Sequence, residues 1–185
     1  MTQSLAYDRP SVRMQALATF VALVAAVALP QVFHAVGALV GVNSALGEVW
    51  LPMHLPIILV GLLAGPYAGG IAGVLAPLVS FATTGMPTVA MLPFMMVELC
   101  VYGVVAGLLR AAKMPTLAKV LAAQVAGRVV RAALIVAANL VLGLTTVGIP
   151  VIWTSIIVGI PGLVLQWALI PVVVRLVEKG QECEL

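Results

Sequence analysis

Six long apolar segments, separated by short stretches rich in polar residues, Gly or Pro, limit what this chain can fold into. A helix that crosses the hydrocarbon core of a bilayer needs about 20 predominantly apolar residues. We therefore expect six spanning helices, at approximately residues 14–36, 51–64, 67–83, 91–109, 117–142 and 151–177. Gly65-Pro66 is typical of a tight turn, which favours two helices over one broken helix or a re-entrant pair. The sequence predicts an all-α membrane protein: residues 1–185 form one compact bundle of six helices.

The scarcity of charge excludes several classes of protein. Hydrophobic residues make up 63% of the chain and charged residues 8%, whereas soluble proteins have about 45–50% and about 25%. A soluble enzyme and a disordered protein are therefore excluded. The net charge of +3 comes without a dense basic patch, which argues against nucleic-acid binding. The chain has no HExxH, GxSxG or P-loop motif, so we expect neither an enzyme nor ATP hydrolysis by this chain.

We expect no cofactor or metal in this chain. Its two cysteines, Cys100 and Cys183, lie far apart in sequence, and no metal-binding spacing such as CxxC is present. Both are interpreted as free thiols. Metal or haem binding by two histidines near methionines is the less favoured alternative.

The distribution of basic residues predicts the topology. Loops 37–50, 84–90 and 143–150 contain no Lys or Arg. Seven of the nine basic residues lie on the other side of a six-helix weave: Arg9, Arg13, Arg110, Lys113, Lys119, Arg175 and Lys179. Because cytoplasmic loops carry an excess of Lys and Arg, both termini should be cytoplasmic. The expected location is the cell membrane.

Three ionisable residues lie inside predicted membrane helices: Glu98, Arg128 and Arg131. At 1.5 Å per residue, Glu98 and Arg131 each lie roughly 18 Å from the cytoplasmic edge, so we predict a buried ion pair between them. A salt bridge that ties two helices together is the simpler interpretation, and a charged cavity floor is the functional one. One carboxylate cannot neutralise both arginines, and the sequence leaves open which of them it pairs with.

The first apolar segment has small residues at a spacing of four: Ala18, Ala22 and Ala26. Small residues at this spacing let two membrane helices approach closely. The stripe is explained equally well by packing inside the bundle and by a docking surface for another membrane subunit.

Two stretches resemble the substrate-binding S components of energy-coupling factor (ECF) vitamin transporters. They are LPMHLPIILVGLLAGPYAGGIAGVLAPLVSFATTGMP and MLPFMMVELCVYGVVAGLLR. The resemblance implies a subunit of a prokaryotic ABC-type importer that binds a vitamin on the outer face. It also implies partners, namely a membrane T subunit and two cytoplasmic ATPases. The family's alanines on the first helix face the T subunit, and Ala18, Ala22 and Ala26 match that pattern.

The resemblance also implies a ligand pocket in the outer halves of the later helices. The corresponding residues are His54, Met91, Met95, Asn139 and Trp153. Methionines, Phe94 and Trp153 with few charges favour a flat, fairly apolar ligand, which supports a cobalamin-related compound such as dimethylbenzimidazole. Pyridoxine-like and pantothenate-like vitamins, and haem or another tetrapyrrole held by His34 or His54, are alternatives. The rival function is a stand-alone secondary transporter or a structural subunit of a larger membrane complex.

Overall fold

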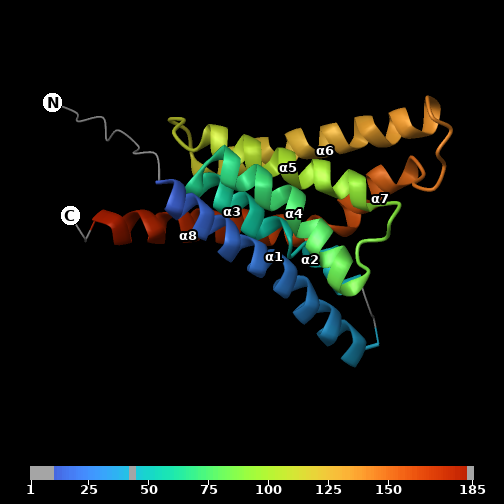
Figure 1. Cartoon of the computed structure of the whole chain (residues 1–185), viewed down its shortest axis with the longest axis horizontal. Coiled ribbons are helices and arrows are strands. Elements are labelled where there is room, and N and C mark those ends of the chain that lie inside the picture. The colour runs from blue at the N-terminus through green and yellow to red at the C-terminus, as the bar shows by residue number, and fades with distance from the viewer. Residues whose placement is uncertain (1–10, 42–44, 183–185) are drawn as a thin grey trace.

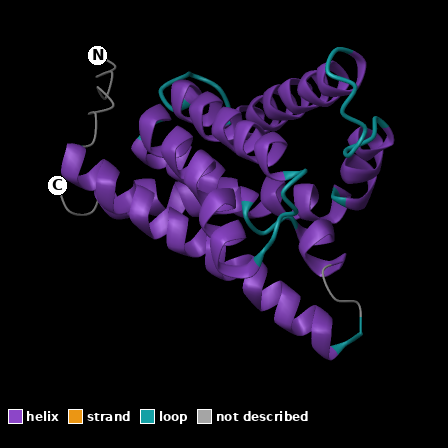
Figure 2. Cartoon of the chain, turned by 45° about the vertical axis from the view of Figure 1, so that its right-hand side comes forward, coloured by secondary structure: helices purple, strands orange, loops and turns teal. Residues whose placement is uncertain are grey.

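The computed structural model describes residues 11–41 and 45–182, which form helices and contain no strand (Figures 1 and 2). Arg9 and Cys183, which entered the sequence predictions, lie outside the described residues. The helices are α1 (Val12–Leu39), α2 (Ala45–Trp50), α3 (His54–Ala64), α4 (Pro66–Thr84), α5 (Leu92–Leu109), α6 (Thr116–Leu140), α7 (Pro150–Val158) and α8 (Ile160–Glu182).

Six helical segments of the described chain are long and apolar enough to cross a membrane. They are α1, the α2–α3 segment Ala45–Ala64, α4, α5, α6 and residues Ile160–Gly180 of α8. This confirms the predicted all-α bundle of six spanning helices. Four of the six predicted segments agree with α1, α4, α5 and α6 to within three residues at each end. The chain is therefore a multi-pass membrane protein.

The second and sixth predicted segments need correction. The helix expected from residue 51 begins at His54, because Leu51 has a φ of 47° and precedes Pro52, which disfavours helical geometry. The segment expected over 151–177 is broken at Gly159 into α7 and α8. Pro161 lies in the first turn of α8, where a missing N–H costs no hydrogen bond. With nine residues, α7 is too short to span a bilayer.

The predicted turn between the second and third spans is present. Gly65 has a φ of 104°, a conformation that residues with a Cβ rarely adopt, and Pro66 begins α4. Helices α3 and α4 are therefore two antiparallel neighbours rather than one broken helix.

Glycines let α4 and α5 pack backbone against backbone. A Cβ added at Gly103 would collide with the backbone of Gly69, and one added at Gly73 would collide with the backbone of Leu99. Close approach of this kind is the usual way in which membrane helices gain packing energy. It fixes the position of α5, which carries Glu98.

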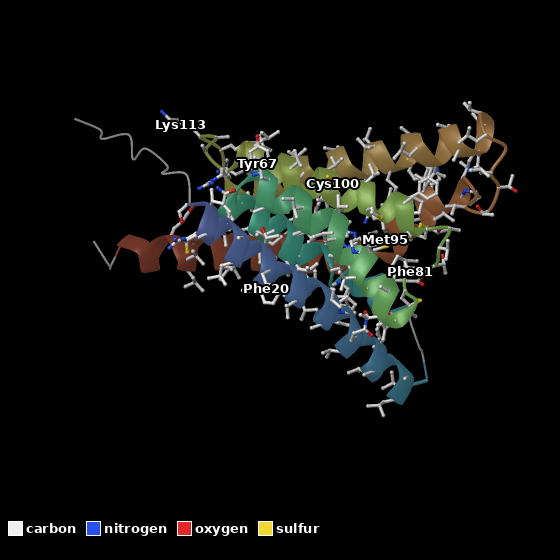
Figure 3. The ribbon with its side chains drawn as sticks, in the orientation of Figure 1. Phe20, Tyr67, Phe81, Met95, Cys100 and Lys113 are labelled. Atoms are coloured by element: carbon white, nitrogen blue, oxygen red, sulfur yellow. The ribbon has the colours of Figure 1, made fainter. Side chains whose placement is uncertain are left out.

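The small-residue stripe of α1 lies inside the bundle. Ala22 and Ala26 are buried in the same apolar cluster as Ile57 of α3 and Ala72 of α4, and Ala18 packs against that cluster. The outward side of α1 presents larger residues such as Phe20, which is labelled in Figure 3 and is 64% exposed. Within the described chain, Ala22 and Ala26 therefore serve internal packing, which is one of the two interpretations of the stripe, and a docking role for Ala18, Ala22 and Ala26 stays a prediction.

Side-chain hydrogen bonds attach α8 to the rest of the bundle. Gln124 Nε2 of α6 donates to Gln166 Oε1 of α8 at 3.0 Å, and Trp167 Nε1 donates to Gln124 Oε1 at 2.6 Å. Gln166 Nε2 also donates to the carbonyl oxygen of Leu51 at 3.3 Å. These bonds hold α8 against α6 and against the connection between α2 and α3.

The bundle has two distinct ends. The start of α1, the α3–α4 turn, the α5–α6 loop and the end of α8 lie together at the left of Figure 1. The α4–α5 and α6–α7 connections lie at the right. Lys113, labelled in Figure 3, lies at the left-hand end, as the topology prediction requires of a loop residue between α5 and α6. We call the left-hand end the basic end and the right-hand end the cavity end. That the basic end is cytoplasmic stays a prediction.

Candidate functional site

A cavity of about 440 Å³ lies between the helices toward the cavity end of the bundle. Its walls come from α1, α2, residues 51–54, α4, residues 86–91, α5, α6 and α7. Small-molecule sites typically have volumes of about 300–1,000 Å³ and combine apolar walls with a few polar groups. The size and position of this cavity therefore fit a ligand site.

The floor of the cavity contains a hydrogen-bonded ion pair between α5 and α6. Arg131 Nη1 lies 3.0 Å from Glu98 Oε2, and the Tyr102 hydroxyl donates to Glu98 Oε1 at 3.0 Å. Glu98 and Tyr102 are one helical turn apart on α5, so both reach the same point. Gly127 of α6 leaves the space that the Tyr102 ring fills, since a Cβ there would collide with the ring. Arg131 Nη2 also lies 3.6 Å from Met91 Sδ.

The sequence left open which arginine pairs with Glu98, and in the structure it is Arg131. Arg128 lies one turn earlier on the same face of α6 and also lines the cavity, but within the described residues it has no hydrogen bond or ion pair. Both oxygens of Glu98 are already engaged, by Arg131 and by Tyr102. The cavity floor therefore carries a cationic group without a protein partner.

Three buried nitrogen atoms of the floor residues lack a hydrogen-bond partner: His54 Nδ1, Arg128 Nε and Arg131 Nε. Buried polar atoms in folded proteins are nearly always paired. Clustered at one cavity, these atoms provide hydrogen-bonding capacity for a bound molecule.

Three of the five residues predicted to bind substrate line the cavity: His54, Met91 and Met95. His54 begins α3, and its ring centroid lies 5.5 Å from that of Tyr102. Met91 precedes α5 and Met95 lies in its first turn, where Figure 3 labels it. The methionines provide adaptable apolar walls above the charged floor.

The other two predicted residues lie outside the cavity lining. Asn139 Nδ2 donates to the carbonyl oxygens of Ile135 and Val147 at 2.8 Å each, which ties the α6–α7 loop to the end of α6. Trp153 on α7 is 67% exposed, which is typical of an aromatic anchor at a membrane interface. Phe94 does not line the cavity either. The aromatic walls expected from the sequence are therefore missing from this cavity.

The structure adds cavity residues that the predicted substrate-binding set omitted. Pro30 of α1, Ser80 of α4 and Ser155 of α7 line it, and exposed Glu48 of α2 lies at its mouth. In the sequence, Pro30 and Ser80 stand out only as a proline and a serine within apolar stretches, and both lie inside continuous helices. Among the residues that the structure describes, no three His, Cys, Asp or Glu side chains are placed to hold a metal ion.

Comparison with known protein families finds a match over residues 13–174 to the family described as ECF transporter, substrate-specific component. No curated protein and no solved structure is similar enough to this chain to count as a match. The match covers most of the 185 residues and confirms the resemblance found in the α3–α5 sequence. A bundle of six spanning helices with a small-molecule cavity agrees with it, and the chain belongs to the substrate-specific S components of ECF transporters.

Proposed function

We propose that this chain captures a vitamin or vitamin precursor in the cavity and delivers it across the cell membrane with a T subunit and two ATPases. S components of ECF transporters bind small-molecule substrates and work with T and ATPase subunits in the membrane. The observation that carries the proposal is the cavity of about 440 Å³ in a bundle of this family.

The position of the cavity supports capture from outside the cell. It lies toward the cavity end, away from the basic end, which we expect to be cytoplasmic from the distribution of Lys and Arg. A ligand from outside enters there without crossing the charged loops. Release to the inside then requires a movement of the bundle, for which the ATPases supply the energy.

The size of the cavity favours a small vitamin or a precursor. Its volume of about 440 Å³ lies in the lower part of the usual range for ligand sites. Dimethylbenzimidazole, pyridoxine-like and pantothenate-like molecules are of this class, whereas an intact corrinoid or haem is much larger. The methionines and charged residues that line the cavity then determine which of these small molecules binds.

Co-purification and uptake test the proposal. The tagged chain should co-purify with a T subunit and ATPases, and proteoliposomes should accumulate the ligand only when all subunits and ATP are present. Met95→Trp separates the two readouts: its side chain should fill the cavity and abolish uptake, while co-purification with the other subunits persists. Uptake by the chain alone, driven by an ion gradient, would instead establish the rival secondary transporter, which the intramembrane charges would also suit.

A further inference from the structure

The charges at the cavity floor do not balance. Glu98 is fully buried, and its two oxygens accept hydrogen bonds from Tyr102 and Arg131. Arg128 is left as a second cation beside a pair that is already neutral. A charged side chain inside a membrane protein is costly unless it is paired, and such residues commonly mark a ligand or ion pathway.

We infer that the cavity binds an organic anion, whose carboxylate or phosphate group pairs with Arg128. This inference rests on the proposed function, since it takes the cavity as the capture site. A guanidinium group presents a planar fork of N–H donors that matches the oxygens of both anionic groups. The unpartnered Nε atoms of Arg128 and Arg131 and Nδ1 of His54 lie at the same cavity and extend the set of contacts.

The other titratable groups at the cavity do not neutralise Arg128. Glu48 lines the mouth on α2 and is exposed, so water solvates its charge. His34 also lies at the mouth, where its ring packs against Gly47. Neither residue forms a hydrogen bond or ion pair with Arg128 in the described structure.

The rest of the cavity lining indicates the polarity of the remainder of the ligand. Met86, Met91 and Met95 form an apolar wall next to the charged floor. The ligand is therefore amphipathic, with an anionic end at Arg128 and a less polar body against the methionines. This chemistry favours acids such as pantothenate-like vitamins or phosphorylated pyridoxal over neutral dimethylbenzimidazole.

Matched pairs of ligands test the charge requirement directly. Binding to the purified chain in detergent is measured by calorimetry for pantothenate against pantothenol, nicotinate against nicotinamide, and pyridoxal 5′-phosphate against pyridoxal, with dimethylbenzimidazole as a further neutral probe. At least one acid should bind, and its neutral partner should bind at least about tenfold more weakly. The pair that responds identifies carboxylate or phosphate as the preferred group.

Variants of Arg128 assign the effect to this residue. Arg128→Gln should lower the affinity for the acid at least about tenfold and leave that for its neutral partner unchanged. Arg128→Lys, which keeps the charge and loses the fork, should restore part of the affinity. Arg175→Gln, at an exposed arginine of α8, is the matched control and should bind as the wild type does.

Thermal stability separates ligand binding from a structural role. Since Arg128 has no protein partner in the described structure, Arg128→Gln should leave the ligand-free protein as stable as the wild type or more stable. A neutral compound that binds as tightly as its acid, an acid whose affinity Arg128→Gln leaves unchanged, or failure of every acid to bind would overturn the inference. Co-purification of the T subunit and ATPases with the same preparations tests the proposed function separately, so that it can hold even if the cavity does not bind an anion.

Discussion

The ion pair between Glu98 and Arg131 should dominate the stability of the helix packing around the cavity. Removing one partner of a buried pair leaves the other charge buried without compensation, which typically costs about 3–5 kcal/mol. Arg131→Gln strands the carboxylate of Glu98, which is 0% exposed. Because Tyr102 still donates to this carboxylate, we expect a loss near the lower end, about 3 kcal/mol.

Glu98→Gln should cost less. It leaves Arg131 without its acid, but the side chain of Arg131 is 11% exposed and lines a cavity. We expect a loss of about 2 kcal/mol, below the usual range for a fully buried pair. Two independent sites would together lose about 5 kcal/mol, whereas the double mutant should lose about 3, a coupling of about 2 kcal/mol.

Thermal unfolding in detergent, followed by tryptophan fluorescence without ligand, measures these losses. For a chain of this size, about 3 kcal/mol corresponds to a fall of roughly 6–12 °C in Tm. Arg128→Gln is the matched control, since it removes an arginine one turn away that does not contact Glu98 in the described structure. Strictly additive losses in the double mutant would show that the two side chains do not interact, and the account of the cavity floor would fail.

The remaining predictions concern packing and topology. Gly103→Leu should prevent folding or lower Tm by more than about 10 °C, because its side chain would enter the backbone of α4, whereas Gly180→Leu, which has open space, should leave Tm unchanged. Ala22→Trp should destabilise the isolated chain, as judged by gel filtration in detergent, because Ala22 is buried inside the bundle. A normally folded variant that loses only assembly with other subunits would instead support the docking interpretation. In a cysteine-free background, a membrane-impermeant thiol reagent should label Thr145→Cys from outside and Lys113→Cys only after permeabilisation, and the reverse pattern would invert the topology.

Much of the fold could be predicted because the bilayer restricts the choices. An apolar segment of about 20 residues has few alternatives to a spanning helix, since backbone polar groups must be paired within it. Gly65-Pro66 marked the turn between α3 and α4, because Gly readily adopts a positive φ and Pro is favoured in the first turn of a helix. The break at Gly159 was missed although Gly159 and Pro161 were visible, because hydropathy continues without interruption across them.

The candidate site was predictable only in part. Depth along a helix follows from residue counting, so Glu98 and Arg131 could be paired from the sequence. Which way a side chain faces depends on how each helix is rotated against its neighbours, and in an apolar chain hydropathy does not report that rotation. For this reason the sequence did not decide that Ala22 and Ala26 face inward, and it placed Trp153 in the ligand pocket although its side chain is exposed.

The sequence alone was sufficient for the number of spanning helices, the concentration of Lys and Arg at one end of the bundle, and the family, because each depends on local composition or motif. The ligand cavity depended on the fold. It arises where stretches far apart in the sequence meet, and its chemistry depends on the Glu98 carboxylate having two donors, which leaves Arg128 unpaired within the described structure. Such an arrangement depends on the distances between helices, and no single segment of the sequence encodes these distances.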